Sequence, residues 1–346
     1  MSANAQGTTS SVASKFGFGS LVRRPEFGAL IGAVAVYIFF SIAGGRAFSD
    51  VGGSASWLNV AAEVGIIALP VALVMIAGDL DLSVGSTLAG SSMTFAIISG
   101  HYELPTWIGA VAAILLGALI GWLNGIIVTK TNLPAFVVTL ATMFAVSGLT
   151  LGFTRLLVGS TSVTMTPDDT FMFLFGNLIG GLFETAVVWW LLVAALVSWI
   201  LYKTKYGNWI YAIGGDVISA RATGIPVAKV RIWLFVGSGV GAALVGVIQT
   251  CLYSGAQVAA GQSFVFNSII AVVIGGVLLT GGYGSTIGVI LGTITFGVVN
   301  QGIYYTGWDA DWAALILGLL LLAAVLTNNT FRRLALSGGK NKKENK

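Results

Sequence analysis

Long apolar segments recur along the whole chain, and polar residues gather in short stretches between them. A helix of about 20 apolar residues crosses a bilayer core of about 30 Å. A membrane barrel would show alternating segments of about ten residues instead. The pattern therefore predicts an all-α polytopic membrane protein with about ten transmembrane helices. Their expected positions are 28–46, 57–77, 84–99, 107–128, 135–158, 182–202, 231–253, 266–280, 285–306 and 311–327.

The composition agrees with this class. The 346 residues are 56% hydrophobic and 9% charged, whereas soluble domains carry about 25% charged residues. One cysteine, Cys251, excludes an internal disulfide, and one histidine, His101, leaves no Cys/His metal site. The phosphate-binding pattern G-x-x-x-x-G-K-[ST] does not occur. We therefore expect a transport protein that is not an enzyme and that holds no cofactor or metal itself.

The Lys and Arg residues orient the helices, because cytoplasmic loops carry the positive excess. With the N-terminus inside, all 17 basic residues except Arg46 and Arg155 lie in inside segments. We expect a cytoplasmic tail at 1–27, a transmembrane domain at 28–328 and a basic cytoplasmic tail at 329–346. The first tail lacks the compact apolar run of a signal peptide. The net charge of +4 follows from this topology and indicates no nucleic-acid partner.

Two of the expected helices, 84–99 and 266–280, are short and adjoin an acidic or Gly-rich interruption. Such segments in two halves indicate a substrate path made of broken helices in an inverted repeat. The halves would be helices two to five and seven to ten. Gly121-Trp-Leu-Asn124 and Gly297-Val-Val-Asn300 echo each other, although chance explains the echo equally well among 47 glycines.

Glycines at helical spacing predict places where two helices approach closely. They are Gly117-x-x-x-Gly121-x-x-x-Gly125, Gly237-x-x-x-Gly241 and Gly288-x-x-x-Gly292.

The stretch Ala77-Gly-Asp-Leu-Asp-Leu-Ser-Val-Gly-Ser86 puts two carboxylates inside an apolar region, where charges are costly and face protein or water. Asp79, Asp81 or Ser83 can cap the helix that follows; direct contact with a substrate is the alternative. Glu63 either reaches the outer interface or faces a pore. The candidates for the translocation pathway or the broken helices are Asp79, Asp81, Ser83, Asn124, Asn267 and Asn300.

The expected cytoplasmic loop at 203–231 is too long to be a simple turn. Asp216 is predicted to cap a short helix that ends at Gly224. Such a helix would dock a soluble partner, whereas a solvated basic loop that only fixes topology explains the composition equally well. The candidate docking residues are Gly215, Asp216, Ala220, Arg221, Gly224 and Ile225, and the expected apolar face comprises Val217, Ala220, Ala222 and Ile225.

Several motifs between about residues 30 and 328 resemble the membrane permease subunits of bacterial ABC importers for simple sugars, of the ribose, xylose and arabinose type. The most specific is Asp81-Leu-Ser-Val-Gly-Ser86. The others are Gly121-Trp-Leu-Asn-Gly125, Leu133-Pro-Ala-Phe-Val-Val-Thr-Leu140, Ile270-Ala-Val-Val-Ile-Gly-Gly276, Gly281-Gly-Tyr-Gly-Ser285, and Ala222-Thr-Gly-Ile225 with Lys229. The chain departs from the family pattern at Asp79, at 215–219, at Asn267 and at 275–278, which leaves the particular sugar open.

The resemblance implies a multi-pass permease subunit that carries a pentose, hexose or polyol across the bacterial inner membrane, with both termini cytoplasmic. It implies a homodimer or heterodimer of permeases over a cytoplasmic ATP-binding subunit that binds ATP and Mg and docks at 203–231. A periplasmic sugar-binding protein would deliver the substrate, and lipid would surround the helices. The alternatives are a branched-chain amino-acid permease and an ion-coupled secondary transporter, for which the deep carboxylates are few.

Overall fold

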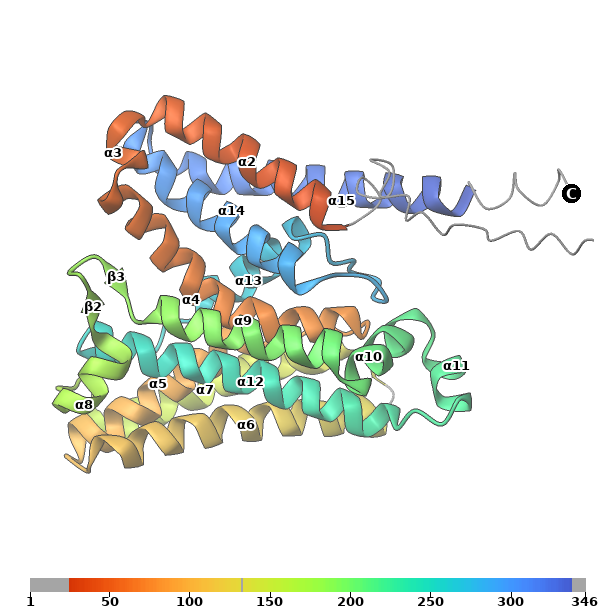
Figure 1. Cartoon of the computed structure of the whole chain (residues 1–346). Coiled ribbons are helices and arrows are strands. Elements are labelled where there is room, and N and C mark those ends of the chain that lie inside the picture. Colours follow the sequence, from red (N-terminus) through yellow and green to blue (C-terminus); the bar gives the residue numbers. More distant parts are fainter. Residues whose placement is uncertain (1–24, 132, 338–346) are drawn as a thin grey trace, which may run out of the picture.

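The computed structural model describes residues 25–131 and 133–337, which are mostly helical (Figure 1). Residues 1–24 and 338–346 of the two expected tails lie outside the described residues.

Each of the ten segments expected to span the membrane falls mainly on a different helix. These helices are α2 (Pro25–Ala43), α4 (Val51–Ile76), α5 (Val84–Ala96), α6 (Thr106–Thr131), α7 (Ala135–Val158), α9 (Ala186–Lys203), α12 (Val227–Leu252), α13 (Gln262–Ile274), α14 (Thr286–Tyr305) and α15 (Trp312–Ser337). Seven of the described helices, α2, α4, α6, α7, α9, α12 and α14, are long and apolar enough to cross a membrane. Two shorter apolar helices cover Gln262–Ile274 and Trp312–Leu326. The protein is thus an all-α multi-pass membrane protein.

Short elements connect these helices. They are α3 (Gly45–Ser49), α8 (Asp169–Phe171), α10 (Lys205–Gly215), α11 (Val217–Ala222) and the π-helical turns η1 (Ile97–His101) and η2 (Met172–Gly176). Strand β1 (Ser162–Thr164) pairs antiparallel with β4 (Gly255–Gln257), with Val163 opposite Ala256. Strand β2 (Leu178–Ile179) pairs antiparallel with β3 (Phe183–Glu184). Figure 1 shows α10 and α11 at one end of the bundle and α3, α8, β2 and β3 at the other.

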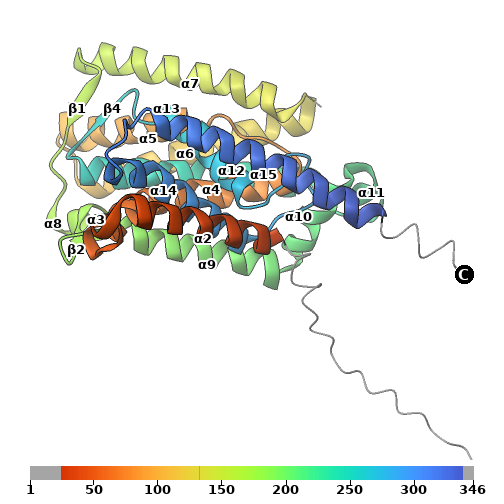
Figure 2. The same ribbon diagram turned by 90° about the horizontal axis from the view of Figure 1, so that it is seen from above.

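Helix α4 is central, and nearly all of it from Ala61 to Ile76 is buried. It packs against α9, α12, α13 and α14. Helices α7 and α9 lie on opposite sides of the bundle (Figure 2). Helix α7 buries only Ala135, Val138, Thr139 and Thr154, so most of its apolar surface is available to lipid or to another subunit.

Helices α6 and α12 touch along their length because glycines remove the side chains between them. A Cβ atom on Gly117 would overlap the carbonyl group of Gly239, and one on Gly121 would overlap that of Phe235. Farther along α6, Gly125 faces Ile232. The register shows that the two helices run antiparallel, and their backbones meet as small residues allow in membranes.

The predicted glycine pair of α12 is only half correct. Gly241 packs against Pro70 of α4, but a Cβ atom on Gly237 would have no neighbour within 4 Å. Gly239, two residues farther on, is the glycine that meets α6. Spacing within one helix cannot reveal which face meets a neighbour.

This difference predicts the effect of adding a side chain. Gly239→Leu should destabilise the protein by about 1–3 kcal/mol, the usual cost of overpacking, because the new atoms overlap α6. Gly237→Leu adds the same atoms to open space and should change the melting temperature little. Thermal unfolding of both variants in detergent measures the effect. Equal melting temperatures for the two variants would contradict the packing of Gly239 against Gly117.

Candidate functional site

The chain is not helical between α4 and α5. Gly78 adopts a φ of 87°, which favours glycine. Its N–H donates to the Met75 carbonyl at 2.9 Å, and the Asp79 N–H donates to the Val74 carbonyl at 3.1 Å. This pair of bonds is a Schellman motif that ends α4. The segment 79–82 then runs without helical structure to Ser83, which precedes α5.

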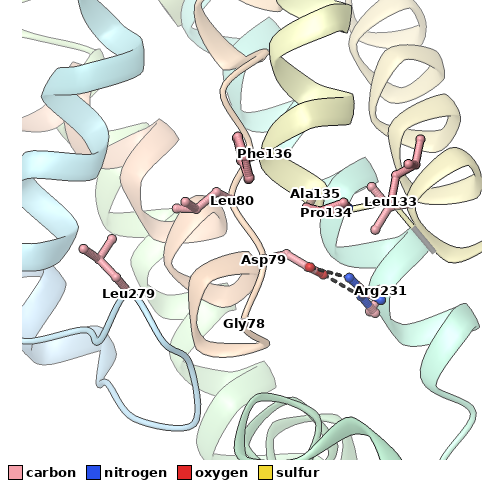
Figure 3. A pocket seen from close by; sticks show the side chains of 10 residues that line it. Gly78, Asp79, Leu80, Leu133, Pro134, Ala135, Phe136, Arg231 and Leu279 are labelled. Carbon is pink, nitrogen blue, oxygen red and sulfur yellow. Dashed lines mark hydrogen bonds and ion pairs between the residues drawn. The ribbon is translucent and has the colours of Figure 1, made fainter. Parts of the chain in front are cut away.

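Asp79 forms an ion pair with Arg231 near the start of α12 (Figure 3). The guanidinium Nε donates to one carboxylate oxygen and its terminal nitrogen to the other. The Asp79 side chain is 6% exposed and that of Arg231 19% exposed, so both charges are largely removed from solvent. The pair joins the interruption to α12. It also corrects one expectation: Asp79 does not cap α5, because Ser83 is the N-cap residue and the Asp79 carboxylate is directed to Arg231.

Asp81 belongs to a second polar network, in which Asp81, Ser83 and Asn124 are buried. Its Oδ1 accepts hydrogen bonds from the Ser83 backbone N–H at 3.0 Å and from the Ser83 hydroxyl at 2.6 Å. Asn124 Nδ2 of α6 donates to Ser83 Oγ at 2.8 Å, and Thr142 Oγ1 of α7 donates to Asn124 Oδ1 at 2.7 Å. The network ties the interruption to α6 and α7, and such networks restrict a buried segment to one arrangement.

The expected cap of α5 is only partly correct. Ser83 occupies the N-cap position, but its side chain accepts no hydrogen bond from the first turn of α5. Instead, the Ser83 hydroxyl donates to Asp81.

Three segments contact one another through backbone atoms at the end of the bundle that carries α10 and α11: the end of α4, the end of α10 and the loop between α13 and α14. The Gly282 N–H, between α13 and α14, donates to the Ile76 carbonyl at 2.8 Å. A Cβ atom on Gly214 of α10 would overlap that same carbonyl, and one on Gly281 would press on Gly78. Gly281 and Gly282 have φ values of 78° and 75°. Only glycine allows the backbones to approach this closely. The end of α10 therefore contacts both the interruption after α4 and the Gly-rich interruption after α13.

An open cavity of about 360 Å³ lies beside the ion pair (Figure 3). The segment 78–80, the start of α7 at 133–136, Val128, Arg231 and Leu279 line it. The Leu80 carbonyl accepts a hydrogen bond from Thr139 of α7 at 3.1 Å. The cavity therefore lies between the interruption and the first turns of α7 and α12.

The short helix in the expected docking loop is present. Asp216 is its N-cap, and its side chain accepts a hydrogen bond from the Ser219 N–H at 2.6 Å. This bond holds the pKa of the Asp216 carboxyl below its usual range. The Ile225 N–H returns to the Ala220 carbonyl at 3.2 Å, while Gly224 adopts a φ of 85°. The local prediction of cap, helix and terminal glycine is confirmed.

The expected apolar face of this helix is wrong at three of its four residues, since only Ala222 is exposed. Ala220 is 3% exposed, and Val217 and Ile225 pack against the hydrophobic core of the bundle. Ile218, by contrast, is 80% exposed, and Arg221 and Ala222 are also exposed. Most of the face predicted to meet a partner instead packs against the bundle. A helix this short has few apolar residues, and they hold α11 against its own protein.

The remaining candidates lie apart from this site. Asn267 and Asn300 are half-buried in α13 and α14, and Asn300 Oδ1 accepts a hydrogen bond from Gln301. Within the described residues, no hydrogen bond joins either asparagine to 79–83. Glu63 is buried and accepts a hydrogen bond from Gln249 of α12 at 3.0 Å, so it does not extend to the outer interface.

Sequence reasoning missed Arg231 and Thr142 as members of the site. Arg231 was counted only as a topology-determining charge. A signal was nevertheless present, because a basic residue at the start of an expected helix is a natural partner for a deep carboxylate.

Residues 53–325 match a family model described as "Branched-chain amino acid transport system / permease component". The chain is 34% identical over 265 residues to the ribose import permease protein RbsC of Escherichia coli (strain K12), covering 76% of this chain and 81% of that protein. It is 33% identical over 279 residues to RbsC of Bacillus subtilis (strain 168), covering 78% and 83%. It is 31% identical over 285 residues to the fructose import permease protein FrcC of Rhizobium meliloti, covering 80% and 78%. No solved structure matches the chain.

The ion pair predicts a specific pattern of stability changes. Arg231→Gln leaves the Asp79 carboxylate buried without a partner and should destabilise the protein by about 3–5 kcal/mol. The double variant Asp79→Asn/Arg231→Gln removes both charges and should recover much of that loss. Thermal unfolding of both single variants and the double variant measures the pairing. Arg221→Gln, at an exposed position, is the control. A double variant no more stable than Arg231→Gln would show that Asp79 is not the partner.

Proposed function

The chain belongs to the family of branched-chain amino acid transport system permease components, and from this membership we propose that it forms the translocation pathway of an ABC importer for a simple sugar. The observation that carries the proposal is the similarity, over about three quarters of the chain, to permeases named for ribose and fructose import. The substrate would be a pentose, a hexose or a polyol.

A branched-chain amino acid is the second candidate substrate, because the family description names it. The similar permeases named for sugars favour the first candidate. Uptake of radiolabelled ribose, fructose and leucine by the complete system separates the two.

We propose that ten helices span the bacterial inner membrane with both termini in the cytoplasm. The distribution of charge supports this orientation. Lys130, Lys203, Lys205, Arg221 and Lys229 lie in or beside the connections at the end with α10 and α11. Arg46 in α3 lies at the opposite end. Since cytoplasmic loops hold the positive excess, α10 and α11 would face the cytoplasm.

Helix packing supports the proposed inverted repeat of α4–α7 and α12–α15. In such a repeat, α6 corresponds to α14 and α12 to α4. Helix α6 packs on α12, and α14 packs on α4. The echo in the sequence lies at these two contacts: Gly121 meets Phe235 of α12, and Gly297 meets Trp57 of α4. The proposed correspondence of α5 to α13 is supported in the same way, since α5 packs on α12 and α13 packs on α4.

The segment 214–225, the docking segment, would transmit the action of a cytoplasmic ATPase. Its Gly214 touches the end of α4, and α11 exposes Ile218 to a partner. A displacement of α11 would therefore be transmitted through backbone contacts to the interruptions that precede α5 and α14. ATP and Mg would be bound by the partner, and a periplasmic binding protein would supply the substrate.

We propose that two permeases, identical or paired with a sister subunit, act together. One chain offers one docking segment, whereas a pair of ATPase subunits presents two sites. A twofold axis along the membrane normal would bring two docking segments to the pair, with the pathway between the permeases.

Energy supply tests the proposed function. Sugar uptake into proteoliposomes that contain the permease, its ATPase and its binding protein should require ATP hydrolysis. An ATPase variant that binds ATP without hydrolysing it should abolish uptake. Uptake that persists with the inactive ATPase and follows a proton or sodium gradient would instead establish an ion-coupled transporter.

The docking segment gives a separate test. Ile218→Asp places a charge on the exposed apolar position and should release the ATPase without unfolding the permease. Gly224→Val requires a β-branched residue to adopt a φ of 85°, which should distort the end of α11 with the same effect. ATPase co-purification and sugar uptake are measured. The control, Lys203→Gln/Lys205→Gln, removes charge from the same end and should retain the ATPase. If both docking-segment variants retain the ATPase and transport normally, the docking assignment is wrong.

A further inference from the structure

The open cavity beside the ion pair combines two charged groups with apolar walls (Figure 3). Among the described residues that line it, only Asp79 and Arg231 are charged, and Leu80, Phe136 and Leu279 are among its apolar side chains. Its volume of about 360 Å³ lies near the lower end of the range of about 300–1,000 Å³ that small-molecule pockets span. The cavity therefore suits a small ligand that is polar on one side and apolar on the other.

The ion pair does not use all the hydrogen-bonding groups of its two side chains. Arg231 donates from Nε and from one terminal nitrogen, and a guanidinium carries further N–H groups on its terminal nitrogens. Each carboxylate oxygen of Asp79 accepts one of these bonds and has the capacity to accept another. The wall of the cavity thus holds hydrogen-bond donors and acceptors side by side.

This arrangement favours a neutral ligand with several hydroxyl groups. The charges of Asp79 and Arg231 cancel, so a charged ligand would have to separate the pair to bind either group. A hydroxyl group both donates and accepts, and adjacent hydroxyls of a sugar can therefore bond to the carboxylate and the guanidinium while the pair stays intact. The side chain of Phe136 is 48% exposed, and its ring offers an apolar surface to the C–H groups of the same sugar.

The position of the cavity is consistent with a transport route. It lies toward the end with α10 and α11, since Leu133 follows the end of α6 and Arg231 lies near the start of α12. One wall is the interruption at 78–80, and another is the start of α7, a helix that leaves most of its surface unburied. A sugar moving along the face of α7 would therefore meet the cavity before it reaches the cytoplasm.

We propose that this cavity is the inner binding site of the translocation pathway and that it holds one pentose, hexose or polyol. The hydroxyls of the sugar bond to Asp79 and Arg231, and its carbon skeleton lies against Phe136. The inference rests on the proposed function. It adds a direct contact between the permease and the substrate, after the binding protein has released the sugar.

The test measures the reactivity of a thiol placed in the wall of the cavity. The natural cysteine, Cys251, is buried and therefore inert, so Leu133→Cys provides a single reactive thiol in the purified full-length permease. The probes are ribose, xylose, fructose and xylitol, with leucine for comparison. At least one of the sugars or the polyol should slow labelling by N-ethylmaleimide in a saturable manner. Ile218→Cys, exposed at the same end outside the cavity, is the control, and its labelling should not change.

Two further variants in the Leu133→Cys background locate the bound sugar. Asp79→Asn/Arg231→Gln removes both charges and should raise the sugar concentration needed for protection about tenfold, since hydrogen bonds to charged groups are the stronger ones. Leu279→Trp fills part of the cavity without changing the ion pair and should abolish protection. Leu149→Trp, at an exposed position of α7 outside the cavity, should leave protection unchanged. Thermal unfolding shows that each variant is folded.

Labelling of Leu133→Cys that none of the sugars slows would overturn the site, as would protection that persists in both the double variant and Leu279→Trp. Protection by leucine alone would overturn the assignment to a sugar. The uptake assay is read separately. ATP-dependent sugar uptake without protection contradicts the cavity site and leaves the proposed function standing. Protection together with uptake that needs no ATP hydrolysis contradicts the proposed ABC importer and leaves the sugar site standing.

Discussion

A polar backbone group that is buried away from water must find a hydrogen-bond partner, and the buried interruption between α4 and α5 depends on this constraint. The segment 77–83 is unfavourable by itself, because its peptide groups lie outside any helix and lack helical hydrogen bonds. The fold offsets this free-energy cost, since neighbouring segments form hydrogen bonds with it and with the end of α4. Asp81 accepts from the Ser83 N–H, Thr139 donates to the Leu80 carbonyl, and Gly282 donates to the Ile76 carbonyl. The interruption is thus a place where hydrogen bonds connect α4 and α5 to neighbouring segments.

The same contacts join the segment 214–225 to both interruptions. The ends of α4 and α13 carry the same closing motif, with Gly78 and Gly276 at φ values of 87° and 88°. The loop after α13 touches both Gly78 and Gly214. These contacts are between backbone atoms, so no side chain separates the segment 214–225 from the two interruptions. The ion pair between Asp79 and Arg231 adds α12 to this assembly, and α12 itself begins just after the docking segment.

The glycines that let α6 and α12 pack closely also shape the outer surface between the two helices. Where Gly121 and Gly125 bring α6 against α12, the same small residues leave a groove on the outside of the bundle beside the exposed Trp122 and Trp233. The same two helices hold the polar network through Asn124 of α6 and the ion pair through Arg231 of α12. The contact of α6 with α12 therefore supports both polar clusters beside the interruption.

The sequence by itself determined the features that depend on local chemistry. The lengths of the apolar runs located the helices, because the thickness of the bilayer sets the length of a spanning segment. Asp216 and Gly224 located α11, because capping and a positive φ are properties of a few neighbouring residues. Tertiary structure decided everything that required two distant segments to meet. Asp79 and Arg231 are 152 positions apart, and no local pattern distinguishes a carboxylate that caps a helix from one that pairs with an arginine. Likewise, the composition of α11 contained its apolar residues, but only packing decided that Ala220 faces the bundle and Ile218 faces outward. A six-residue helix does not specify its own buried face, since that face is defined by the surface against which it folds.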